Sequence, residues 1–125
     1  MKRMRPSGKL LWLLVPLLAA PTPGDVGGCG SAPAELDPPV FFASRDAILC
    51  DACGRCGFDS TSCRAACSAP DRRGDRFPDR CVPLVHDGVV CLRALSHASC
   101  DEVARFVDDV RPEIPTECDF CPEGG

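Results

Sequence analysis

The chain has 125 residues, 11 of them cysteine, and a formal net charge of −4 at neutral pH. Its first 28 residues carry four basic residues and one acidic residue, so that the remainder has 10 basic and 17 acidic residues and a net charge of −7. Such an acidic surface excludes nucleic acid as a partner, because phosphate binding needs clustered basic side chains.

The N-terminus has the layout of an export signal. Lys2, Arg3, Arg5 and Lys9 precede an apolar run, Leu10 to Ala20. As a helix, this run would reach only about 16 Å, about half the hydrocarbon core of a bilayer. The pattern therefore predicts a signal peptide over residues 1–28 rather than a membrane span.

The segment Val26-Gly27-Gly28-Cys29 resembles the lipobox of bacterial lipoproteins. The resemblance implies that Cys29 carries a lipid and becomes the first residue of the mature chain, held at the outer membrane. The alternative is ordinary cleavage near Gly24 or Gly28, which would release the chain to the periplasm or the medium. Residues 29–40 are rich in proline and are predicted to form an extended tether.

The other ten cysteines lie in the last 76 positions, and their even number predicts five disulfides of unassigned pairing. Large apolar side chains are few, so we expect these bonds to stabilise the fold in place of a large core. The predicted fold class is a small all-α, disulfide-rich domain over residues 41–121, followed by a flexible C-terminus at 122–125. The cysteines concerned are Cys50, Cys53, Cys56, Cys63, Cys67, Cys81, Cys91, Cys100, Cys118 and Cys121.

Two helices are predicted in the first half of this domain. The first covers residues 41–53, with Ser44 or Asp46 near its start and Gly54 or Gly57 at its end. The second is short, is capped within residues 60–62, and carries Cys63 and Cys67. These two cysteines are four positions apart, so we expect both to face the same partner element. A charged loop follows over residues 68–79, with Phe77 as its inward residue.

The second half is predicted to form an α-hairpin, with helices at about 80–95 and 100–110. Asp79 is the expected cap of the first helix, and Gly88 a weak point in it. The expected core stripe of that helix is Cys81, Val85, Val89 and Leu92, with Cys91 and Leu95 at its edge. Ser99 and Glu102 match a capping box for the second helix, which is expected to end at Arg111-Pro112. Its inward residues are Val103, Phe106, Val107 and Val110.

No catalytic, cofactor-binding or metal site is predicted. His86 and His97 have no arrangement with a nucleophile and a carboxylate, and are interpreted as solvated. One alternative function remains open: a metal or thiol-redox centre, which would use the cysteines of the C-x₂-C motifs. Those cysteines are Cys50, Cys53, Cys56, Cys118 and Cys121.

The cysteine-spaced region is similar to uncharacterised cysteine-rich lipoproteins and secreted proteins of GC-rich Gram-negative bacteria. The residues that carry this resemblance are Cys81, Cys91-Leu92-x-Ala94-Leu95, Ser99-Cys100-Asp101-Glu102 and Pro115-x-x-Cys118-x-x-Cys121. The resemblance implies an envelope location and brings no assigned activity. The expected function is therefore a lipid-anchored structural or binding protein that exposes the loop Asp71 to Arg80, with a secreted effector or inhibitor as a further alternative.

Overall fold

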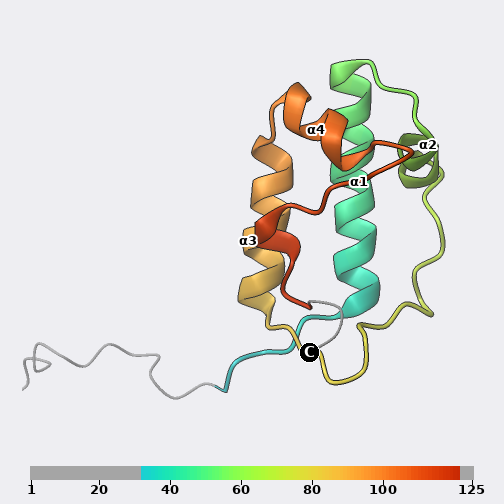
Figure 1. Ribbon diagram of the computed structural model, residues 1–125. Coiled ribbons are helices and arrows are strands. Elements are labelled where there is room, and N and C mark those ends of the chain that lie inside the picture. Colours follow the sequence, from blue (N-terminus) through green and yellow to red (C-terminus); the bar gives the residue numbers. More distant parts are fainter. Residues whose placement is uncertain (1–31, 122–125) are drawn as a thin grey trace, which may run out of the picture. The chain divides into compact units, whose positions relative to one another are not determined.

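The computed structural model describes residues 32–121, which contain four α-helices and one short 3₁₀ turn joined by loops (Figure 1). This confirms the predicted all-α class. No helix within these residues is long and apolar enough to cross a bilayer. The predictions for the signal peptide, Cys29 and residues 122–125 lie outside the described residues. In order, the elements are α1 (Pro38–Cys56), α2 (Thr61–Cys67), α3 (Val85–His97), α4 (Cys100–Phe106) and η3 (Thr116–Cys118).

Helix α1 begins earlier than predicted, within the expected tether. Asp37 is its N-cap, and prolines fill the first two helical positions, where a missing N–H costs nothing. Before the helix, the backbone at residues 34–36 pairs with residues 83–85 through two hydrogen bonds of 2.9 Å. The predicted tether boundary at residue 40 is therefore too late. The helix ends at Cys56, and the following Gly57 caps it with a φ of 72°, which glycine adopts without strain.

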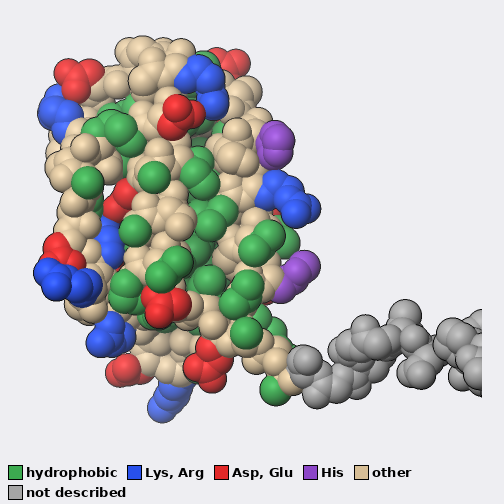
Figure 2. Space-filling view, turned by 180° about the vertical axis from the view of Figure 1, so that it is seen from behind, with side chains coloured by type: hydrophobic (Ala, Val, Ile, Leu, Met, Phe, Trp, Pro, Cys, Tyr) green, Lys and Arg blue, Asp and Glu red, His purple; other side chains and the backbone are tan. Residues whose placement is uncertain are grey.

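The buried face of α3 differs from the predicted stripe. Gly88, Cys91 and Leu95 are buried, whereas Val85 and Val89 are more than 40% exposed. The helix starts at Val85 rather than near residue 80, because the preceding residues are extended and pair with residues 34–36. Asp79 therefore does not cap it. Figure 2 views the molecule from behind relative to Figure 1. Hydrophobic side chains, in green, are exposed on that face near the two histidines of α3, in purple.

Gly88 does more than lower the stability of the helix, because the side chain of Leu36 packs against it. A Cβ atom at this position would lie 2.6 Å from Cδ1 of Leu36. Leu36 thus packs directly on the backbone of α3, in the place that any larger side chain would occupy. The contact fixes the segment before α1 against the first turns of α3.

Helix α4 begins as predicted and ends early. Glu102 accepts a hydrogen bond from the Ser99 backbone at 2.8 Å, which completes the capping box. Beyond Phe106 the Asp108 carboxylate accepts from the backbone N–H groups of Val110 and Arg111, at 2.9 and 2.6 Å. This local turn competes with further helix. It leaves Val110 85% exposed instead of buried.

All ten cysteines of the described region form disulfides. Cys63 and Cys67 both bond to α1, as their spacing predicted. Each bond contributes about 3–4 kcal/mol in the chain-entropy account, since the separations run from 10 to 44 residues. The pairs are Cys50–Cys67, Cys53–Cys63, Cys56–Cys100, Cys81–Cys121 and Cys91–Cys118.

Candidate binding pocket

A pocket of about 510 Å³ lies between α1, α2, the charged loop and the C-terminal tail. Small-molecule sites typically measure about 300–1,000 Å³, so the pocket has the size of a ligand site. Most of the residues that line it are apolar. The lining comes from residues 41–49 of α1, residues 62–66 of α2, residues 72–78 of the loop and residues 112–121 of the tail. Cys91 and Leu95 of α3 and Phe106 of α4 complete it.

Five phenylalanines line the pocket, and four of them form one aromatic cluster, whereas Phe106 lies on α4. Phe41 and Phe42 come from α1, Phe77 from the loop and Phe120 from the tail. The ring of Phe41 lies 5.3, 5.9 and 5.6 Å from the rings of Phe42, Phe77 and Phe120, measured between centroids. These separations are typical of favourable aromatic pairs. The prediction that Phe77 points inward is confirmed.

A buried ion pair joins the loop to α1. The side chain of Asp46 is only 7% exposed and accepts hydrogen bonds from Nε and Nη2 of Arg72, at 2.8 and 2.5 Å. Arg72 also donates to Asp75 at 3.1 Å. The hydrogen bond to Asp46 is the main cause that raises the pKa of Arg72, so the guanidinium stays charged.

The loop that was predicted to be exposed is therefore anchored at one end. Arg72 lines the pocket, whereas Asp71 and Arg73 form an exposed pair. Arg72 was not among the predicted site residues, and Asp46, expected near a helix start, lies instead in a buried ion pair. A signal was present: on α1, Asp46 lies four positions after Phe42 and three before Leu49, and hence on the apolar face.

Arg45 lies beside this pair and is less fully hydrogen-bonded. Its Nη2 donates to Oδ1 of Asp46 at 3.3 Å, and its Cζ lies 4.9 Å from the centroid of the Phe42 ring. The side chain is 33% exposed, and its buried Nε has no hydrogen-bond partner among the described residues. A guanidinium has five N–H donors, so Arg45 retains donors for another acceptor.

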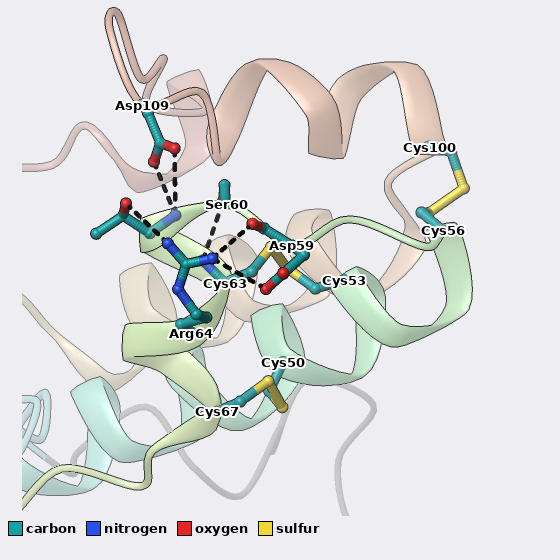
Figure 3. The surroundings of a disulfide bond; sticks show 11 residues. Cys50, Cys53, Cys56, Asp59, Ser60, Cys63, Arg64, Cys67, Cys100 and Asp109 are labelled. Atoms are coloured by element: carbon teal, nitrogen blue, oxygen red, sulfur yellow. Dashed lines mark hydrogen bonds and ion pairs between the residues drawn. A yellow bond between two sulfur atoms is a disulfide. The ribbon is translucent and has the colours of Figure 1, made fainter.

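Helix α2 is fixed to the rest of the domain at both ends (Figure 3). Two disulfides, Cys50–Cys67 and Cys53–Cys63, attach it to α1. At its start, the backbone N–H of Thr61 donates to both carboxylate oxygens of Asp109, at 2.9 and 3.2 Å. The α2 side of the pocket is thus rigidly held although the helix has only seven residues.

The tail side of the pocket is held by two disulfides and by backbone contacts. Cys118 bonds to α3 and Cys121 to the segment before it. Farther back, the N–H of Glu113 donates to the carbonyl of Arg105 at 3.0 Å, and their side chains form an ion pair of 3.1 Å. The carboxylate of Glu113 is therefore partly neutralised where the residue lines the pocket.

The cysteines of the C-x₂-C motifs are not brought together as a centre. Cys50, Cys53 and Cys56 bond to α2 and α4, while Cys118 and Cys121 bond to α3 and to Cys81. This pairing consumes the thiols that a metal or redox centre would use. Within residues 32–121, no group of three or more histidine, cysteine or acidic side chains is arranged to hold a metal ion. His86 and His97 are exposed on α3.

Five disulfides in so short a region indicate an oxidising location outside the cytoplasm. No protein-family model, no curated protein and no solved structure matches the chain.

Proposed function

We propose that the chain is an exported, non-catalytic binding protein, anchored to the outer membrane by a lipid on Cys29. The pocket between α1, α2, the loop and the tail is its binding site. The observation that carries the proposal is the way in which the pocket is built. Four of the five disulfides attach α2 or the tail to the remaining elements, so the shape of the pocket is fixed before a ligand arrives.

A fixed pocket favours binding because little chain entropy is lost when a ligand enters it. The lining residues also favour binding over catalysis. The polar side chains of the lining are Arg45, Asp46, Ser62, Arg72 and Glu113, and both carboxylates among them are paired with arginines. The hydroxyl of Ser62 therefore has no histidine or unpaired carboxylate in the lining to act as its base, as nucleophilic catalysis needs. The short stretch from Cys29 to Ala34 would place the binding domain close to the membrane surface if Cys29 is acylated.

The anchor is tested by growing cells that express the chain with labelled palmitate. We expect the label in the wild-type chain and in a Ser31→Ala control, and its loss in Cys29→Ala. A wild-type chain without label, found in the medium, would support the secreted effector or inhibitor instead. The intact mass of the exported protein reports the cleavage site and the acyl chains in the same sample.

The structural role of the cysteines is tested by counting free thiols in the denatured, unreduced protein. We expect none in the acylated protein, and one if Cys29 is free. A count of four or more, with Cys50, Cys53, Cys56, Cys118 and Cys121 among the reactive residues, would favour the metal or thiol-redox alternative.

A further inference from the structure

We infer that the ligand of the pocket is a free long-chain fatty acid, with its hydrocarbon chain against the phenylalanine rings and its carboxylate on Arg45. This inference rests on the proposed binding role and names the ligand class for that same pocket. It follows from the polarity of the lining, from the unused donors of Arg45 and from the charges around them.

The lining favours a ligand with few polar groups. Each residue of a bound peptide would bring a backbone N–H and a C=O, and burying these without partners is costly. The pocket offers few free partners: Asp46 and Arg72 are bonded to each other, and Glu113 is paired with Arg105. The other polar side chains of the lining are Ser62 and Arg45, too few for a peptide backbone. A hydrocarbon chain needs no such partners and gains by leaving water.

One end of the ligand must nevertheless be an acceptor. Arg45 lines the pocket with one-third of its side chain exposed, and within residues 32–121 only its Nη2 donates to a protein acceptor. A carboxylate can accept two N–H groups of one guanidinium. The nearby acidic side chains do not prevent this approach, because Asp46 lies between two arginines and Asp75 is bonded to Arg72.

The aromatic cluster supplies the apolar surface for the chain. Its rings come from three segments and touch one another at centroid distances of 5.3 to 6.1 Å. Ile114, on the tail, extends the apolar lining toward solvent, and it is 69% exposed. A long side chain that is exposed in the free protein and lines a pocket is a contact that a ligand can cover.

The test measures fluorescence of cis-parinaric acid, added after removal of lipid to the mature chain with Cys29→Ala, which is exported behind a cleavable signal peptide that replaces residues 1–28. The mature chain has no tryptophan or tyrosine, so the probe signal is free of intrinsic emission. We expect one saturable site. Palmitic acid should displace the probe at a concentration about ten-fold lower than hexadecanol, because only the acid gives Arg45 a charged acceptor.

Two matched pairs of variants locate the site. Ile114→Asp should weaken binding of the probe about ten-fold, since it places a charged carboxylate on the apolar lining. The dissociation constant of Val110→Asp should stay within about two-fold of the wild-type value. Val110 is also exposed on the tail but does not line the pocket. Arg45→Met should remove the preference for palmitic acid over hexadecanol. Arg93→Met, at an exposed position on α3, should keep that preference.

Several outcomes would overturn the inference. They are a folded, fully oxidised wild-type chain that does not bind the probe, equal binding by Ile114→Asp and the wild type, or equal displacement by acid and alcohol. Preferential binding to phospholipid vesicles or to an apolar peptide would also contradict it. Palmitate labelling of Cys29 is a separate readout, so a failed anchor and a failed ligand are told apart.

Discussion

The two sides of the pocket are held together in different ways. On the α2 side, two disulfides join helices whose apolar residues already form a buried core, with Ala52, Cys53, Cys63 and Val103 each at most 3% exposed. On the tail side, residues 107–121 contain only the three-residue η3, and most of their side chains are exposed. Disulfides therefore reinforce an existing core on the first side. On the second side they hold a segment with little regular structure, whose main apolar contact is the ring of Phe120 against Phe41 and Phe77.

The largest expected effect comes from removing a disulfide on each side. Cys91→Ala/Cys118→Ala should lower the free energy of unfolding by about 4 kcal/mol, and Cys53→Ala/Cys63→Ala by about 3 kcal/mol, because the second loop is shorter. Urea unfolding of both exported variants measures these changes. Hydrogen exchange should separate them further: only the first variant should lose protection in the tail.

Binding of cis-parinaric acid provides a second measurement on the same two disulfide variants. The tail variant should lose binding to the pocket, since residues 112–121 line it, and the α1–α2 variant should retain binding at low denaturant. If the tail stays protected without its disulfide to α3, contacts other than the disulfide hold it, and the contrast between the two sides is wrong.

The next effect concerns the anchor of the charged loop. Asp46→Asn leaves Arg72 facing a neutral amide, and breaking a buried pair costs about 3 kcal/mol or more. Trypsin should then cut faster after Arg73 and Arg76, which follow the anchor. The control is Asp51→Asn on the same helix, whose pair with Arg55 is largely exposed and should contribute less than about 1 kcal/mol. Equal trypsin sensitivity in the two variants would contradict an anchoring role for Asp46.

The elements that the sequence predicted well are those with local signals. The capping serines at residues 60 and 99, the αL glycine at 57 and the four-residue spacing of Cys63 and Cys67 each act within one or two turns of helix. Such signals can be read without knowing the partner element.

The features that the sequence did not reveal depend on distant contacts. The face of α3 follows from the pairing of residues 34–36 with residues 83–85, and Gly88 is buried because Leu36 covers it. The pocket needs Asp46 and Arg72, 26 positions apart, to meet. The disulfide pairing likewise depends on tertiary geometry, since ten cysteines allow about 945 arrangements.

A smaller effect is expected from two glycine replacements of opposite sign. Gly88→Ala should lower the free energy of unfolding by about 1 kcal/mol or less, because displacing the side chain of Leu36 from the new Cβ costs slightly more than the helical preference of alanine returns. Gly54→Ala should raise it by about 0.5–1 kcal/mol, because this helical position has open space around it. Thermal unfolding of both variants measures the two changes. A stabilising Gly88→Ala would mean that Leu36 moves freely and does not fix the segment before α1.

The smallest effect is a pH dependence of stability, which arises from Glu102 at the start of α4 and Asp108 at the start of the tail. Backbone N–H groups of Arg111 and Val110 lower the pKa of Asp108, and the Ser99 backbone lowers the pKa of Glu102. A lowered pKa in the folded state stabilises the protein above the unfolded pKa, and this stability is lost as the pH falls through the folded value. Both losses should therefore occur below about pH 4.

Urea unfolding between pH 6 and pH 2 should show less acid sensitivity in Asp108→Asn and in Glu102→Gln than in the wild type. Hydrogen exchange at low pH should show early opening of residues 108–115 in the wild type, while the disulfides keep residues 116–121 attached. Opening of the whole tail at once would mean that Asp108, rather than the disulfides, holds it in place.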